Sequence, residues 1–177
     1  MKKIIIVNGL IAGVIVTLWM IAGMFGFVMQ THSVLIGYTT MLVAFSFIFI
    51  GVKNYRDKQN GGLISFGKAF QIGILITIIA STIYVGVWLI YFNYFDPDFL
   101  EKYTSQTIAK MKANQAGTVE IKKQTDQLKA YAALYKNWFY NALFTYAEIL
   151  PVGLIVTVTC ALILKRKNIS ESSLISK

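Results

Sequence analysis

The sequence predicts an all-α integral membrane protein with four transmembrane helices and an extramembrane helical hairpin between the third and fourth spans. Of the 177 residues, 56% are hydrophobic and only 14% are charged, whereas an average soluble domain carries about 25% charged residues. The apolar residues gather in four long segments, and most of the basic residues lie between or beyond these segments. The composition excludes a disordered chain, which would be rich in charge and poor in aromatic residues.

Four apolar segments are long enough to cross a bilayer, because a spanning helix needs about 20 apolar residues. The predicted spans are residues 4–29, 34–52, 69–95 and 138–164. Apolar runs such as 74–79 do not alternate as the strands of a membrane barrel would, so we expect helices. The first span is longer than the apolar region of a cleaved signal peptide, which is about 7–15 residues, and we expect it to be retained.

The basic residues predict the orientation, because loops rich in Lys and Arg stay in the cytoplasm. The N-terminus, the loop 53–68 and the tail 165–177 together carry ten of the 17 basic residues and two acidic ones. The opposite face has an uncharged turn at 30–33 and the segment 96–137, which carries seven lysines and five acidic residues. Both termini are therefore expected in the cytoplasm of an inner-membrane protein. Nucleic-acid binding is not expected, since it requires basic residues on one soluble face.

The segment 96–137 predicts two antiparallel helices that form an external hairpin. Asp96-Pro97-Asp98 indicates a helix start with Asp96 as the N-cap. Ala116-Gly117-Thr118 indicates a stop at Gly117 and a restart with Thr118 as the next N-cap. The second helix either ends before the fourth span or runs into it without a break.

Each predicted arm of the hairpin carries an apolar stripe. In the first arm the stripe is Leu100, Tyr103, Ile108 and Met111, and in the second arm Ile121, Leu128 and Tyr135 recur every seven residues. The two stripes either pack on each other or on a second copy, or they form a docking surface for a partner outside the membrane. Small helical hairpins are marginal in water, so a packing partner of some kind is expected.

The candidate functional site lies within the membrane and centres on Glu148. Ionisable groups in spans are costly and often functional. Glu148 is either an interfacial carboxylate about 5 Å below the outer boundary, or a buried acid paired with His32, Asn93 or Tyr91. Pro151 lies one turn further on, where it removes a backbone donor.

Small and polar residues within the spans predict helix packing. Gly9 and Gly13 have the spacing that allows close approach of another helix. The serines and threonines of the spans, such as Ser81, do not form a recognisable polar track in the sequence. Trp19 lies far from the predicted aromatic belts, and its indole N–H needs a partner.

The loop 53–68 predicts a cytoplasmic turn. Gly61-Gly62 indicates the turn itself, and Ser65 is the expected N-cap of the third membrane helix. The lysines of this loop are explained by attraction to anionic lipid headgroups.

No residue pattern indicates catalysis, a cofactor or a metal. The one histidine, His32, and the one cysteine, Cys160, are predicted near opposite ends of the membrane, so they cannot act as a nucleophile and its base. Metal-binding pairs, nucleotide-binding loops and hydrolase motifs are missing from the sequence. We therefore expect a protein that is not an enzyme.

Several strings resemble the domain-of-unknown-function 4199 family, which consists of small multi-span bacterial membrane proteins. The matching strings are residues 51–58, Gly61-Gly62, 64–70, 96–99 and 148–154. The resemblance covers nearly the whole chain and implies an inner-membrane protein with this topology. It implies no activity and no catalytic residues.

These observations favour a non-enzymatic scaffold or interaction protein whose partners are the lipid bilayer and either a second copy or an unknown membrane or periplasmic protein. The alternative is a small transporter or channel component that uses Glu148. The two hypotheses differ in whether Glu148 or the hairpin is essential.

Overall fold

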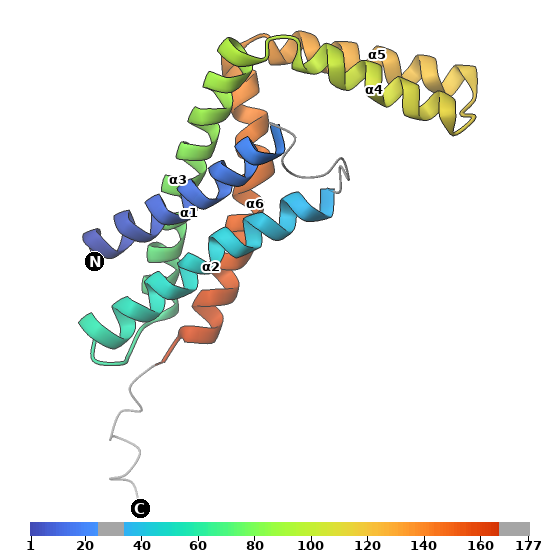
Figure 1. Cartoon of the computed structure of the whole chain (residues 1–177). Coiled ribbons are helices and arrows are strands. Elements are labelled where there is room, and N and C mark those ends of the chain that lie inside the picture. The colour runs from blue at the N-terminus through green and yellow to red at the C-terminus, as the bar shows by residue number, and fades with distance from the viewer. Residues whose placement is uncertain (25–33, 167–177) are drawn as a thin grey trace, which may run out of the picture. The chain divides into compact units, whose positions relative to one another are not determined.

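The computed structural model describes residues 1–24 and 34–166, and the regular structure in these ranges is helical (Figure 1). The α-helices are α1 (Lys2–Met24), α2 (Val34–Gln59), α3 (Phe66–Ile90), α4 (Phe99–Ala113), α5 (Thr118–Tyr135) and α6 (Trp138–Leu164). A π-helical turn, η1 (Tyr91–Phe95), continues α3. The described ranges contain no strand, only an isolated antiparallel bridge between Ile64 and Arg166. The all-α class is therefore confirmed.

Four of these helices are long and apolar enough to cross a membrane: Lys2–Gly23, Gly37–Gln59, Phe66–Phe95 and Trp138–Leu164. They coincide with the four predicted segments. The end of the first predicted span, the turn 30–33 and the tail beyond residue 166 lie outside the described residues.

The second helix extends beyond its predicted span. It continues past residue 52 through the charged residues to Gln59, because the first residues that cannot continue it are Gly61 and Gly62. Both adopt the left-handed conformation, with φ +60° and +80°, which glycine reaches at little cost. The predicted turn is therefore confirmed. Ser65 caps the next helix as predicted, since its Oγ accepts a hydrogen bond from the Lys68 N–H.

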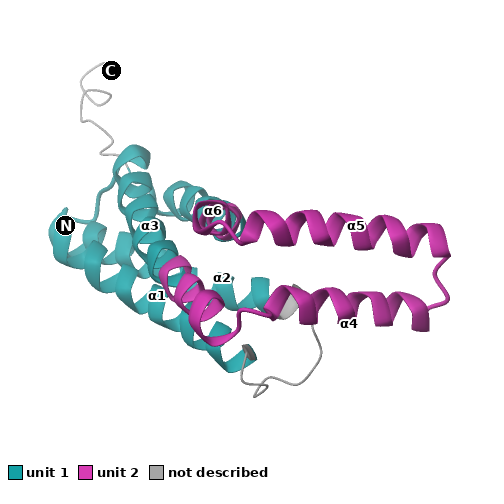
Figure 2. Ribbon diagram, turned by 90° about the horizontal axis from the view of Figure 1, so that it is seen from above, with its two compact units in different colours: residues 1–84, 148–177 teal, residues 85–147 magenta. Residues whose placement is uncertain are grey.

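The chain divides into two compact units, which are coloured separately in Figure 2. Unit 1 comprises Met1–Tyr84 and Glu148–Lys177, and unit 2 comprises Val85–Ala147. Unit 1 therefore contains α1, α2 and most of α3 and α6. Unit 2 contains the end of α3, η1, α4, α5 and the start of α6.

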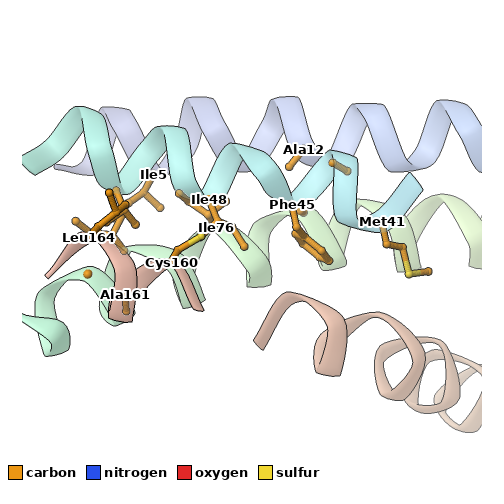
Figure 3. Packing of buried hydrophobic residues seen from close by; sticks show 14 of the residues in the cluster. Ile5, Ala12, Met41, Phe45, Ile48, Ile76, Cys160, Ala161 and Leu164 are labelled. Atoms are coloured by element: carbon orange, nitrogen blue, oxygen red, sulfur yellow. The ribbon is translucent and has the colours of Figure 1, made fainter. Parts of the chain in front are cut away.

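Unit 1 has an apolar core to which all four of its helices contribute. Figure 3 shows part of this core, in which Ile5 of α1, Phe45 of α2, Ile76 of α3 and Leu164 of α6 are buried. The Gly9 and Gly13 pair is used as the sequence predicts. A Cβ atom at Gly9 would lie 2.8 Å from Ile79 Cβ, and one at Gly13 would lie 3.2 Å from the Ala80 backbone.

Unit 2 has no comparable core in its two central helices, because neither α4 nor α5 contains a buried residue. The two helices contact each other, and Figure 2 shows them running side by side. Ile121, Leu128 and Tyr135, the residues of the seven-residue repeat, are half-buried. Tyr103, which the sequence assigns to the stripe of the first arm, is instead 51% exposed.

Three predicted helix boundaries in unit 2 are wrong by a few residues. The first helix begins at Phe99 with Asp98 at the N-cap position, because the Asp96 carboxylate pairs with Lys102 at 2.7 Å instead of capping the backbone. At the other end of this helix Gln115, not Gly117, adopts the left-handed conformation, with φ +57°. Gly117 is the N-cap of α5, so Thr118 is its first residue.

The helix α5 does not run unbroken into α6, which settles a question that the sequence leaves open. It ends at Tyr135, and α6 begins at Trp138. Asn137 causes the restart, since its Oδ1 accepts a hydrogen bond from the Phe139 N–H at 2.9 Å. This is the bond of an N-cap residue.

Candidate functional site

One end of unit 1 is held by a set of contacts that we call the inner clasp. Ile64 and Arg166 exchange two backbone hydrogen bonds, at 3.1 and 2.9 Å. Arg56 donates to the carbonyl of Leu164, the last residue of α6, at 3.5 Å, a position where a cation is favoured by the helix dipole. The Met1 amine donates to Gln59 Oε1 at 2.6 Å. The start of the chain, the loop after α2 and the end of α6 therefore lie at the same end of unit 1.

A second feature of unit 1 is the α3–α6 crossing, formed by Gly73 and Thr77 of α3 and Gly153 and Thr157 of α6. A Cβ atom at Gly73 would lie 2.7 Å from Thr157 Cγ2, and one at Gly153 would collide with Thr77 Cγ2. Each threonine thus packs on the glycine of the other helix. The two hydroxyl groups are 3.2 Å apart, and Thr77 also donates to the Gly73 carbonyl at 3.0 Å.

Unit 2 is organised around Asn141, which is completely buried at the start of α6. Its Oδ1 accepts a hydrogen bond from Trp88 Nε1 at 2.8 Å, and its Nδ2 donates to the Tyr135 carbonyl at 3.4 Å. The Tyr135 carbonyl is at the end of α5, where helix carbonyls lack a partner. The Thr145 hydroxyl donates to the Asn141 carbonyl. One amide side chain therefore joins α3, the end of α5 and α6.

Trp88, the partner of this amide, belongs to a group of contacting rings that we call the aromatic cluster: Trp88, Phe92, Phe99, Tyr135 and Phe144. Trp88 meets Phe99 edge-on with ring centroids 5.3 Å apart. The Tyr135 ring lies 6.2 Å from Phe92 and 5.4 Å from Phe144. Such ring pairs contribute about 0.5–1.5 kcal/mol beyond the area that they bury. The cluster thus fixes the first turn of α4 and the last turn of α5 to the ends of α3 and α6.

The surface of α4 and α5 away from this cluster is polar with isolated apolar side chains. Val119 is 82% exposed and Leu134 40%, whereas Tyr131 meets Phe144 of the cluster edge-on with ring centroids 6.4 Å apart. The Asp96–Lys102 ion pair lies at the start of α4, and its hydrogen bond raises the pKa of the Lys102 ammonium group above the ordinary value. The described surface of α4 and α5 is therefore exposed and mostly polar.

Of the predicted site residues, the structure describes Glu148, Pro151 and Asn93. Glu148 and Pro151 both lie on α6 with exposed side chains, and no hydrogen bond or ion pair of Glu148 occurs among the described residues. The Asn93 amide donates to the Leu89 carbonyl of its own helix turn at 2.7 Å. His32 lies outside the described residues. The role of Glu148 therefore remains a prediction.

Titratable side chains do not form a metal site in the described part of the chain, where no group of three or more His, Cys, Asp or Glu residues gathers. Cys160 is buried in the core of unit 1.

The family model described as "Protein of unknown function (DUF4199)" matches residues 8–166, which is most of the chain. The chain belongs to the DUF4199 family. This match confirms the resemblance in the sequence strings. Comparison with the curated proteins and with the solved structures finds no match. The DUF4199 region includes the α3–α6 crossing, the aromatic cluster and the inner clasp apart from Met1.

Two features of this DUF4199 protein escape analysis of its sequence. The motif Gly-x-x-x-Thr occurs at 13–17, 73–77 and 153–157, so it is a signal of close helix packing that does not identify which two helices cross. Asn141 carries no comparable signal, because a lone asparagine near a predicted span end is typical of an interfacial residue. Its burial depends on rings that are up to 53 residues away in the chain.

Proposed function

We propose that this DUF4199 protein is a non-enzymatic scaffold or interaction protein of the bacterial inner membrane, with four spans, both termini in the cytoplasm and α4 and α5 as an external hairpin. The observation that carries the proposal is the contrast between the buried base of the hairpin at Asn141 and the absence of any buried residue in α4 and α5. A pair of polar helices that is held firmly at its base is suited to present a binding surface.

The topology has two lines of support. The inner clasp joins Met1, the loop after α2 and the end of α6 at one end of unit 1, as four spans with both termini on one side require. The basic residues Lys53, Arg56 and Arg166 belong to the same end, and basic residues favour the cytoplasmic side.

Exposed aromatic residues support membrane insertion. In unit 2, Tyr94 is 82% exposed, Phe95 72% and Trp138 68%. Large aromatic side chains in water would be unfavourable, but Trp and Tyr are stable at the level of the lipid headgroups. These residues flank the ends of the third and fourth apolar helices, where an interfacial belt is expected.

The experiment that tests the proposal is cross-linking in membranes. Replacing Val119 and Leu134, which are 82% and 40% exposed, by Glu is expected to abolish cross-links to a second copy or to a partner, since it removes exposed apolar surface and adds charge. The matched control replaces Gln106 and Gln127 by Glu, which adds the same charge without removing apolar surface. Equal cross-linking by both double variants would contradict an interaction role for the hairpin.

The transport alternative depends on Glu148, a lone acid in an apolar helix. In this case Glu148→Gln would abolish proton- or cation-coupled flux in reconstituted vesicles and leave cross-linking unchanged. The scaffold hypothesis predicts that Glu148→Gln is tolerated. A relay normally requires a chain of titratable groups, and the described residues contain no cluster of acids or histidines around it.

A further inference from the structure

A groove between α1 and α2 has no role in the proposed function. Its volume is about 690 Å³, and it is lined by Ile15, Leu18, Trp19 and Ala22 of α1 and by Thr39, Thr40 and Val43 of α2. Pockets for small ligands typically enclose about 300–1,000 Å³ and are mostly apolar. The groove has this size and this character.

The sequence explains why the two helices leave a groove at this level. Closer to the inner clasp, α1 and α2 fill the space between them with buried side chains, among them Ile5, Ala12, Ile48 and Val52. Beyond Val16 and Met41, the last buried apolar residues on this side, the facing positions are the small residues Ala22, Thr39 and Thr40. These side chains are too short to bridge the gap.

The rim of the groove consists of apolar side chains that face outward. Leu18 is 59% exposed, Val43 57% and Trp19 41%. Both helices are candidate membrane spans. If they cross the bilayer as proposed, the groove opens into lipid, and the molecules that have access to it are acyl chains.

Trp19 supplies one polar group to this apolar site. No hydrogen bond of its indole N–H occurs among the described residues, although an indole N–H away from water usually has an acceptor. Neither threonine of the groove is without a partner, so Trp19 is the donor available to a ligand.

Trp19 lies 16 residues after Lys3, about 24 Å along the helix axis. The sequence places Trp19 near the middle of the predicted span 4–29, but in a hydrocarbon core about 30 Å thick that begins at Lys3 this depth is about 6 Å from the outer boundary. The indole is therefore within reach of the ester groups of the outer leaflet.

We propose that the groove binds one phospholipid of the outer leaflet, with an acyl chain between α1 and α2 and an ester carbonyl that accepts the hydrogen bond of Trp19. The inference rests on the proposed membrane insertion and is independent of the scaffold role. It requires no particular headgroup, since the lining residues carry no charge.

The test is native mass spectrometry of the full chain released from detergent, with Ala22→Phe to fill the groove. The matched control is Ile155→Phe on α6, at a side chain that is 66% exposed and is not part of the groove lining. We expect the wild type and the control to retain one phospholipid per chain. Ala22→Phe should retain at least five-fold less phospholipid, and its thermal midpoint should be unchanged. Equal retention by all three proteins would indicate non-specific surface lipid and would overturn the proposal.

A second measurement covers the case in which Ala22→Phe fails to fold. Delipidated wild type and Trp19→Phe are titrated with a brominated phosphatidylcholine, and the difference in their tryptophan fluorescence isolates Trp19. Quenching that saturates at one lipid per chain supports the groove site, whereas quenching that rises linearly with lipid contradicts it. A dimer that protects Trp19 from quenching would identify a second copy as the occupant and would also overturn the proposal. Release of the protein by carbonate washing would instead contradict the membrane insertion.

Discussion

In the α3–α6 crossing, two helices approach until the methyl group of Thr77 occupies the space that a side chain at position 153 would need. In α4 and α5, by contrast, no residue is buried. Both pairs of helices are antiparallel, but the crossing gains its specificity from contacts within the pair. The α4–α5 pair depends on its ends, where Asn141 and the aromatic cluster hold it. A helix pair can therefore be well positioned without a core, and its outer faces remain available for a partner.

The largest effect is expected at the crossing itself. Gly153→Val should cost about 3 kcal/mol or more, because overpacking alone costs about 1–3 kcal/mol and the atoms in its way belong to β-branched Thr77 and to Phe45. The thermal midpoint in detergent and the yield from membranes measure this effect. Gly86→Val is the control, since a Cβ atom at Gly86 would meet no atom within 4 Å. Equal losses of stability in Gly153→Val and Gly86→Val would show that the change in helix propensity, and not close packing at the crossing, causes the effect.

The base of the α4–α5 pair should be the next most sensitive position. Asn141→Ala removes the acceptor of Trp88 Nε1 and the donor to the Tyr135 carbonyl. Leaving a buried polar group without a partner costs about 1–3 kcal/mol. Asn93→Ala should change stability by less than about 0.5 kcal/mol, because its side chain is exposed. In a double-mutant cycle that combines Asn141→Ala with Trp88→Phe, the two losses of stability should be non-additive by about 1 kcal/mol. Additive losses would contradict the hydrogen bond between Trp88 and Asn141.

Exposed positions on α5 should separate binding from stability. Val119→Glu alone should leave the thermal midpoint within the change expected of surface substitutions, about 0.5 kcal/mol, because Val119 is 82% exposed. Cross-linking in membranes should nevertheless decrease. A fall in thermal stability comparable to that of Asn141→Ala would mean that α5 packs against more of its own chain than its exposure indicates.

The smallest effect is expected for the ion pair at the start of α4. The pKa of Lys102 is raised in the folded protein by its hydrogen bond to Asp96. The contribution of the ion pair to folding stability is therefore complete below the ordinary lysine pKa of about 10.4. This contribution is lost as the pH rises through the raised pKa of Lys102. An NMR titration of the Lys102 side chain should give a lower pKa in Asp96→Asn than in the wild type. An identical pKa in both proteins would show that the pair does not form in solution.

The sequence predicts the features that depend on local patterns. Helices appear where apolar runs have the length of a span, and Gly61-Gly62 and Ser65 form the turn and the cap because each acts within a few residues. The Gly9 and Gly13 spacing likewise predicts close packing, although the sequence does not identify the contacting helix. The helix that starts at Phe99 differs from the prediction because Asp96 has an alternative partner, Lys102, that competes with capping.

Features that depend on distant residues were not predictable in the same way. The Thr77–Thr157 contact joins residues 80 positions apart, and nothing in either stretch specifies the other. Asn141 resembles any interfacial asparagine until its aromatic neighbours are in place. The site predicted from Glu148, His32 and Asn93 followed from residue types that are rare in spans, and rarity gives no information about which of them come together.

The measurement that tests the central claim most directly is cysteine labelling in intact spheroplasts, in a Cys160→Ser background. Ser105→Cys places a thiol on the exposed side of α4, and Lys58→Cys places one near the end of α2. Four spans with cytoplasmic termini predict that a membrane-impermeant maleimide labels Ser105→Cys and reaches Lys58→Cys only after the membrane is opened. Labelling of Lys58→Cys from outside, with Ser105→Cys protected, would contradict this topology.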